Sequence, residues 1–255
     1  MDNFRASYFA GALMINRFQA KEEVQELFQS ETWNGDSILE LLNRHAVTPE
    51  TFLHRLSQIL PGIFKITELH YLRFEHLVGR NEIELTKELN MPRTLVPSGV
   101  RLKEHYCRRW LPVSLLKILE GKRQNGDFKK ILIRAQRAKF MESGDEVLFI
   151  SIAHSLRLRT KMNRCVSLGL RVDNALKRKV KFLNDPQIPV IEVNQTCERC
   201  PLENSQCSER TVPPSVFIRE GQEELLNKRL KHLMTDYRGK NLKNLKNKSK
   251  REIGI

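Results

Sequence analysis

The sequence predicts an α+β protein: a helical N-terminal segment, then a mixed-sheet sensor domain with a C-terminal cysteine cluster and helix. Apolar residues recur with helical spacing through the first 60 residues, whereas short apolar or alternating runs dominate from 130 to 193. Three cysteines then lie close together between Cys197 and Cys207. At 255 residues, the chain is long enough to bury a substantial core.

The N-terminal segment, residues 1–62, is expected to be entirely helical. From Asn3 to Gln29 the apolar spacing is that of an amphipathic helix in two pieces, as shown by Ala6, Phe9, Ala10, Leu13, Val24, Leu27 and Phe28. A third helix opens near Asp36. A fourth has Thr48 as N-cap and Pro49 at its first position, and we expect it to end before Pro61.

Residues 63–237 are expected to form an α/β domain. A helix is expected from about Leu102 to Leu119, where Pro112 must kink it or mark a restart. A short helix is expected at 176–182. Alternating or continuous apolar residues predict the strands, which fall at 64–74, 82–89, 130–135, 147–153, 166–172 and 190–193.

The net charge and the cysteines indicate which partners and which cellular compartment suit this protein. The formal net charge of +14 suits polyanions such as nucleic acid, phosphates or coenzyme A. No apolar run approaches the ~20 residues that cross a bilayer, and residues 1–12 lack the features of a secretory signal. We therefore expect a cytoplasmic protein without a membrane partner. Thiols stay reduced there, so clustered cysteines indicate metal binding rather than disulfides.

The C-terminal end is the most basic part of the chain. From Arg238 onward the sequence is rich in Lys and Asn with little to bury, so we expect a disordered basic tail over 238–255. Such a tail acts as a solubilising end, or it makes weak, salt-sensitive contacts with nucleic acid.

The segment from Cys197 through Cys200 to Cys207 has the pattern Cys-x2-Cys-x6-Cys. Two thiolates three positions apart can bind one side of a metal ion, and the six-residue loop that follows brings a third thiolate to it. Tetrahedral zinc and a cubane iron–sulfur cluster both use four ligands, so a fourth is required. The pattern itself leaves both metals open: zinc would staple the fold, whereas a cluster would add redox sensitivity.

Two other cysteines are candidates for the fourth ligand. Cys107 lies at an expected loop-to-helix junction, whereas Cys165 starts a strand whose alternation points its neighbours into the core. Free buried cysteines are common in such strands. We therefore favour Cys107, and His105 is a further donor that a zinc site would accept.

Residues 41–56 have the helix, turn and capped second helix of a helix-turn-helix, with Glu50, His54 and Arg55 expected on an exposed side. Structural packing of these helices is the simpler reading, and direct DNA binding by residues 36–60 and the tail is the alternative. No His-Glu-x-x-His, Gly-x-Ser-x-Gly or phosphate-binding glycine loop is present, so no enzymatic activity is expected.

Several of these segments resemble bacterial regulators that join an Xre-type helix-turn-helix, an ImmA/IrrE-like metallopeptidase domain and a short-chain fatty acyl-CoA-responsive sensor domain. Residues 6–14, Ala-Ser-Tyr-Phe-Ala-Gly-Ala-Leu-Met, are similar to the helix after the peptidase motif, and residues 47–56 to the segment that completes that domain. Cys107-Arg108-Arg109-Trp110 matches the family's Cys-x-x-Trp, and Cys197 to Arg210 matches its terminal cysteine pattern. The likeness covers most of residues 3–236.

The resemblance implies a transcription regulator whose C-terminal domain senses an acyl-CoA-like metabolite. It implies a 4Fe-4S cluster, with zinc as the alternative, held by Cys107, Cys197, Cys200 and Cys207. The peptidase motif and the DNA-binding head would precede Met1, and Asn3 stands where the family has an acidic zinc ligand, so a degenerate peptidase is the remaining alternative. DNA would be bound by a segment outside this chain, and a homodimer is a candidate assembly. Candidates for contact with ligand phosphates are Arg134, Arg137, Arg157, Arg159 and Lys161.

Overall fold

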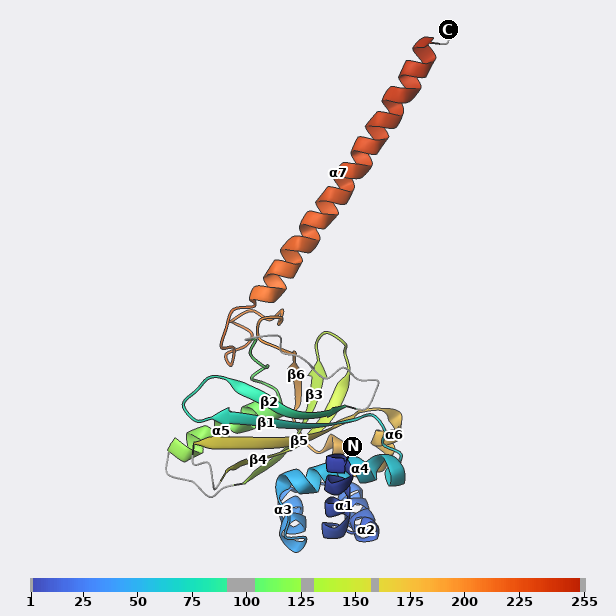
Figure 1. Ribbon diagram of the computed structural model, residues 1–255. Helices are drawn as coiled ribbons and strands as arrows, with labels where there is room; N and C mark the ends of the chain where they lie inside the picture. The colour runs from blue at the N-terminus through green and yellow to red at the C-terminus, as the bar shows by residue number, and fades with distance from the viewer. Residues whose placement is uncertain (1, 91–103, 125–130, 157–160, 253–255) are drawn as a thin grey trace.

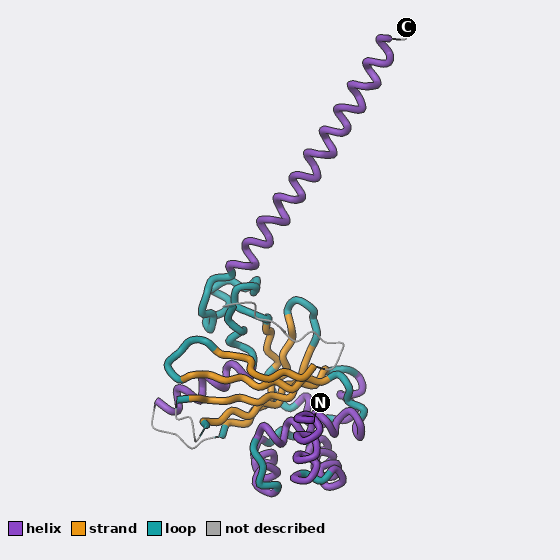
Figure 2. The backbone as a smooth tube through the Cα atoms, in the orientation of Figure 1, coloured by secondary structure: helices purple, strands orange, loops and turns teal. Residues whose placement is uncertain are grey.

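The computed structural model describes residues 2–90, 104–124, 131–156 and 161–252, and it has the expected α+β architecture. A six-stranded mixed sheet forms the middle layer, with helices α1 to α4 on one side and α5 on the other (Figure 1). The tube view separates these N-terminal helices from the sheet and from the long C-terminal helix α7 (Figure 2). The predicted fold class is therefore confirmed.

The N-terminal helices begin where polar side chains satisfy the first backbone N–H groups. Asn16, Asn34 and Thr48 cap α2, α3 and α4, and each side chain accepts a hydrogen bond from a first-turn N–H. The predicted cap at Thr48 is confirmed. The four helices are α1 (Asp2–Met14), α2 (Arg17–Gln29), α3 (Gly35–Arg44) and α4 (Pro49–Phe64).

The expected end of α4 before Pro61 is wrong, because the helix continues through Pro61 to Phe64. Pro61 removes one N–H donor near the end of the helix, while the turn before it is held by buried Ile59 and Leu60. The helix closes instead at Lys65, which has a left-handed φ of 55°, and the N–H of Ile66 donates to the carbonyl of Leu60. The expected domain boundary at 62/63 therefore falls inside a helix.

The sheet has the strand order β2-β1-β5-β4-β3-β6. All neighbours are antiparallel except β3 and β6, which run parallel. Each predicted strand has a counterpart, although the first starts five residues later than expected because α4 runs on to Phe64. The strands are β1 (Leu69–Leu77), β2 (Ile83–Asn90), β3 (Leu132–Phe140), β4 (Glu146–Ser155), β5 (Met162–Arg171) and β6 (Val190–Val193).

Helix α5 (Leu111–Gln124) shows that Pro112 marks a helix start. Proline is tolerated in the first turn because the N–H that it lacks has no partner inside the helix. The earlier part of the helix that we expected from Leu102 is contradicted at 104–110, which form an isolated bridge and a turn, and residues 91–103 lie outside the described residues. Cys107 lies just before this start, as expected.

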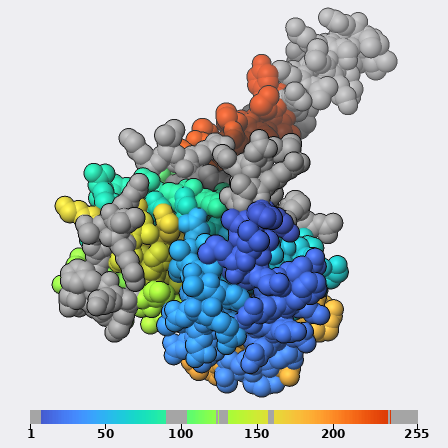
Figure 3. Space-filling model, turned by 60° about the horizontal axis from the view of Figure 1, so that its bottom comes forward, coloured from blue at the N-terminus to red at the C-terminus, as the bar shows by residue number. Residues whose placement is uncertain are grey.

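Two hydrophobic cores lie on opposite faces of the sheet. The first joins α2, α3, α4 and α6 (Asn174–Lys179) to one face of β1, β4 and β5, and the blue N-terminal helices cover this side (Figure 3). The second lies under α5 around Trp110, which is fully buried and packs edge-on against Phe74, Phe140 and Phe149. The first core crosses the expected 62/63 boundary, so the helices and the sheet share one interior.

After α6, a 3-10 helix (Lys181–Asn184) and β6 lead into the cysteine segment and then into α7 (Ser215–Glu252). We expected disorder from 238, but the helix continues to Glu252; residues 253–255 lie outside the described residues. The sequence contains no proline after Pro214 that would interrupt the helix, and ion pairs one turn apart, such as Glu224 with Lys228 at 2.7 Å, support its first half. Within the described residues, no helix combines the length and apolar character needed to span a membrane.

Candidate metal and ligand site

Backbone pairing brings the distant Cys107 beside the C-terminal cysteines. Tyr106 and Thr196 form an isolated antiparallel bridge. The N–H of Cys197 donates to the carbonyl of His105 at 2.8 Å, and the N–H of Cys107 donates to that of Gln195 at 3.2 Å. A short two-stranded ladder thus places Cys107 and Cys197 on adjacent segments.

The cysteine loop is held by the side chain of Arg210. Its guanidinium donates to the carbonyl oxygens of Cys197 at 2.8 Å and Cys200 at 3.4 Å, and also to that of Leu202. These contacts fold the loop back on itself and bring Cys207 toward the other two. Arg210 thus organises the backbone of the cysteine loop.

Cys107, Cys197, Cys200 and Cys207 all line one small cavity of about 10 Å³. Each of the four side chains is buried. The volume is about that of a single water-sized site. Cys165 does not line this cavity; it is fully buried in β5, paired with Phe74 and Ala153, in agreement with its reading as a core residue.

The thiols of Cys107 and Cys207 lie in settings that oppose and favour ionisation at once. Burial raises the pKa of both thiols, whereas backbone N–H groups directed at the sulfurs lower it. For Cys107 these N–H groups belong to Asn194 and Arg109; for Cys207 they belong to Glu209 and Arg210. The net effect of burial is a raised pKa for both thiols, while the N–H groups are already placed to stabilise thiolates if a metal displaces the protons.

Arg108 is a buried cation with unused donors beside this cavity. Its side chain lines the cavity, the residue is 7% exposed, and its Nη2 donates to the carbonyl of Asn81 at 2.7 Å. Its Nε and Nη1 have no hydrogen-bond partner among the described residues. Because a buried guanidinium needs a counter-charge, these orphaned donors fit a site that becomes anionic when four thiolates bind a metal.

The four thiols share a cavity, but they do not yet surround a common point. In the part of the chain that the structure describes, no group of three or more His, Cys, Asp or Glu side chains is close enough to hold a metal ion. The sulfurs must therefore draw together to coordinate one. The donor types and the orphaned donors of Arg108 fit a thiolate-bound metal, and the cavity volume fits one ion better than an eight-atom cubane.

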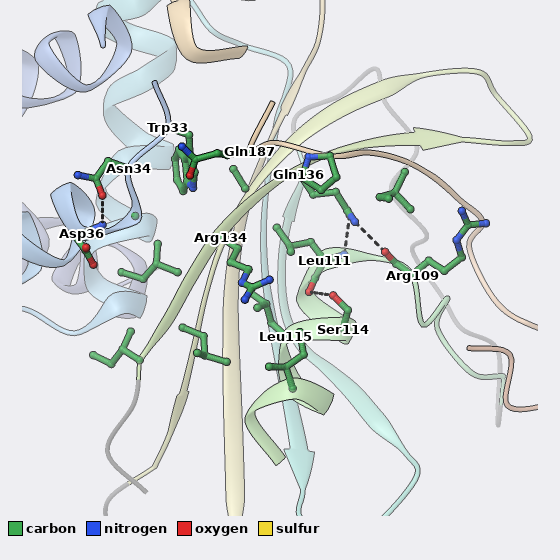
Figure 4. A pocket seen from close by; sticks show the side chains of 18 of the residues that line it. Trp33, Asn34, Asp36, Arg109, Leu111, Ser114, Leu115, Arg134, Gln136 and Gln187 are labelled. Carbon is green, nitrogen blue, oxygen red and sulfur yellow. Dashed lines mark hydrogen bonds between the residues drawn. The ribbon is translucent and has the colours of Figure 1, made fainter. Parts of the chain in front are cut away.

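A larger cleft of about 900 Å³ adjoins the cysteine cavity, and Arg108 and Arg109 line both. One wall is the start of α5 and another is the start of α3 (Figure 4). Gln136 connects β3 to α5, because its Oε1 accepts from the N–H of Leu111 at 2.9 Å and its Nε2 donates to the carbonyl of Arg109 at 3.1 Å. The cleft is within the usual volume of a small-molecule site, and it combines apolar walls with arginines.

The floor of the cleft includes the part of β3 that lies beyond the end of its partner β6. Pairing with β6 begins only at Arg137, whose N–H donates to the carbonyl of Pro189. Because alternate residues of a strand point their N–H and C=O groups to the same side, Ile133 and Ala135 direct theirs beyond the end of β6. Gly35 permits α3 to approach this edge, since a Cβ there would lie 3.0 Å from the carbonyl oxygen of Ile133.

Among the five basic residues expected to contact a ligand, Arg134 lines the cleft and is exposed. Arg137 points to the other face of the sheet, where it pairs with Glu146 and Asn184, so the structure places it in a different environment. Lys161 is exposed in a turn outside the cleft, and Arg157 and Arg159 lie outside the described residues. Arg108 and Arg109 also line the cleft but were not among the predicted ligand contacts, although their position next to Cys107 was a signal.

The helix-turn-helix-like segment is turned toward the protein interior. Arg55 is 4% exposed and donates to the carbonyl of Ile15, so the expectation that it lies on an exposed side is wrong. Glu50 pairs with Arg73 at 2.8 Å and Arg164 at 3.0 Å, and His54 packs on the ring of Tyr71. The side chains expected to face DNA thus anchor α4 to the sheet.

Comparison of the chain with protein-family models, curated proteins and solved structures finds no match. The resemblance to Xre-type regulators with an ImmA/IrrE-like domain therefore stays a prediction.

Proposed function

We propose that this chain is the non-catalytic, ligand-sensing part of a bacterial transcriptional regulator, whose DNA-binding segment lies outside it. Cys107, Cys197, Cys200 and Cys207 hold a metal, and the adjoining cleft binds an acyl-CoA-like metabolite. The observation that carries the proposal is that Arg108 and Arg109 line both spaces. A molecule in the cleft would therefore contact residues next to a metal ligand.

Zinc is the better candidate for the metal. The cavity has room for about one water-sized occupant, and four cysteine sulfurs are a common donor set for structural zinc. Bound zinc supplies four bonds that tie the segment at 107 to the loop at 197–207. The resulting negative charge would satisfy Arg108, and the N–H groups near Cys107 and Cys207 would stabilise the thiolates.

The chemistry of the cleft suits an elongated, anionic ligand. Arg109 and Arg134 are available for phosphates, since a guanidinium binds phosphate oxygens with paired donors. Leu115, Ile118 and Ile131 provide apolar surface for an acyl chain. The part of β3 beyond the end of β6 offers backbone donors and acceptors that suit the amides of an acyl-pantetheine arm.

Calorimetric titration of zinc-loaded protein with short-chain acyl-CoA and with free coenzyme A tests the ligand assignment. We expect Arg134→Ala to weaken binding of both by about tenfold, as for loss of one charge-assisted contact. Lys139→Ala removes an exposed positive charge from the same strand outside the cleft and is the matched control. Absence of binding to the unaltered protein, or equal effects of the two substitutions, would refute the assignment.

Repeating the titration after removal of zinc by a chelator tests the connection between the two sites. We expect weaker ligand binding, because Arg108 and Arg109 would lose their fixed position. Equal affinity with and without zinc would show that the metal is not coupled to the cleft.

A further inference from the structure

Beyond its first turns, helix α7 projects from the rest of the protein, and it exposes large apolar side chains. It spans 38 residues, about 57 Å at the rise of an α-helix, and projects away from the sheet (Figure 1). Among its described side chains, the large exposed apolar ones are between 45% and 69% exposed, and they are Phe217, Ile218, Leu225, Leu226, Leu230, Leu233, Met234 and Tyr237. Such a surface on a free helix indicates a partner.

Four of these residues form a seam with coiled-coil spacing. Leu226, Leu230, Leu233 and Tyr237 follow one another at intervals of four, three and four residues. This is the spacing of the apolar positions in a heptad repeat, which places them on one side of the helix. Met234 borders the same side. The seam is therefore suited to packing against another helix.

The charges on either side of the seam are opposite in sign. Glu220, Glu223 and Glu224 precede it with a single cation, Arg219, whereas Arg238, Lys240 and Lys243 follow it. Two copies aligned in parallel would bring like charges together. An antiparallel pair can set the apolar position 230 opposite 233, and 226 opposite 237. The acidic position 223 then falls opposite the basic position 240, and 220 opposite 243. The antiparallel arrangement therefore matches both the seam and the net charges of the two segments.

We propose that α7 is a homodimerisation helix that pairs antiparallel with α7 of a second copy, through the seam Leu226, Leu230, Leu233 and Tyr237. The two sheet domains then lie at opposite ends of the paired helices. This inference is independent of the metal and of the ligand in the cleft.

Sedimentation equilibrium of the full chain between about 1 and 500 µM tests the association, a range that covers the affinity expected of a short seam. We expect a concentration-dependent dimer that Leu230→Glu weakens at least about tenfold by placing charge in the seam. Thr235→Glu, on the opposite side of the helix, is the control because Thr235 is also exposed. A monomer throughout this range, or equal weakening by both substitutions, would overturn the proposal.

Oxidative crosslinking tests the orientation. We expect a mixture of Leu226→Cys and Tyr237→Cys chains, one of them carrying a mass tag, to form the mixed disulfide in preference to links between identical chains. The unaltered chain controls for its native cysteines. Links within each variant alone, without the mixed product, would show parallel pairing and refute the antiparallel arrangement.

Discussion

Tyr106 and Thr196, ninety positions apart in the chain, form an isolated β-bridge. The hydrogen bonds on either side of this bridge fix Cys107 next to Cys197. The candidate metal site thus depends on a pairing between the segment that leads into α5 and the segment that follows β6.

Replacement of Cys107 is expected to abolish stoichiometric zinc binding, whereas replacement of Cys165 is not. Only Cys107 lines the cavity shared with the C-terminal cysteines. Zinc, iron and sulfide should be measured per chain for Cys107→Ala and Cys165→Ala, purified without oxygen. About one zinc and no visible colour are expected for the Cys165 variant. Iron and sulfide with a brown absorbance would instead identify a cluster, and equal zinc in both variants would exclude Cys107 as a ligand.

Arg210→Lys is expected to weaken zinc binding by about 10- to 100-fold, as for other residues that position ligands. Lysine keeps the charge but cannot reach the carbonyls of Cys197, Cys200 and Leu202 together. Competition with a chromophoric chelator measures the affinity. The control is Arg219→Lys, because Arg219 is exposed on α7 and contacts Glu223 at 4.0 Å. Similar affinities for the two variants would contradict the role of Arg210.

Two glycine substitutions should have opposite effects on stability. A Cβ at Gly169 in β5 would lie 2.6 Å from the ring of Phe149, so Gly169→Ala should lower the free energy of unfolding by about 1–3 kcal/mol. Gly121 in α5 has open space around it, so Gly121→Ala should raise that energy by about 0.5–1 kcal/mol. Urea unfolding followed by circular dichroism measures both. An unchanged free energy of unfolding for Gly169→Ala would contradict the close approach of β5 to Phe149.

Acidification should destabilise the protein partly through His154. Burial lowers the pKa of this side chain below its ordinary 6.5. The unfolded chain then binds more protons than the folded one as pH falls below 6.5, so the free energy of unfolding decreases. Urea unfolding at pH 8, 6.5 and 5.5 should show a smaller decrease for His154→Gln, relative to its own value at pH 8. His232→Gln on exposed α7 is the control. Parallel pH dependence of the unaltered protein and His154→Gln would refute the contribution.

The fold was predictable where local patterns agree with packing. Alternation and apolar runs identify the strands because both faces of the sheet are covered, and Thr48 with Pro49 identifies a helix start because the cap is local. Pro61 was misread because a helix tolerates proline when buried neighbours and a left-handed cap hold its end. The helix beyond 238 was missed because low apolar content was taken to indicate disorder.

The site was predictable only in part. The spacing of Cys197, Cys200 and Cys207 suggests a metal without any knowledge of the fold, and the favoured partner Cys107 shares their cavity. The arginines that line the cleft could not be identified in the same way, because the face of the sheet to which a side chain points depends on its position in the strand. Arg134 and Arg137 differ by three positions and so lie on opposite faces of the sheet.

The base of α7 is tied to the cysteine loop, since the N–H groups of Val216 and Phe217 both donate to the carbonyl of Glu198. A change in the backbone between Cys197 and Cys200 would therefore change the direction of the whole helix. Because α7 is about 57 Å long, a tilt of about 5° at its base displaces its far end by about 5 Å. The position of the distal part of α7 therefore depends on the backbone between Cys197 and Cys200.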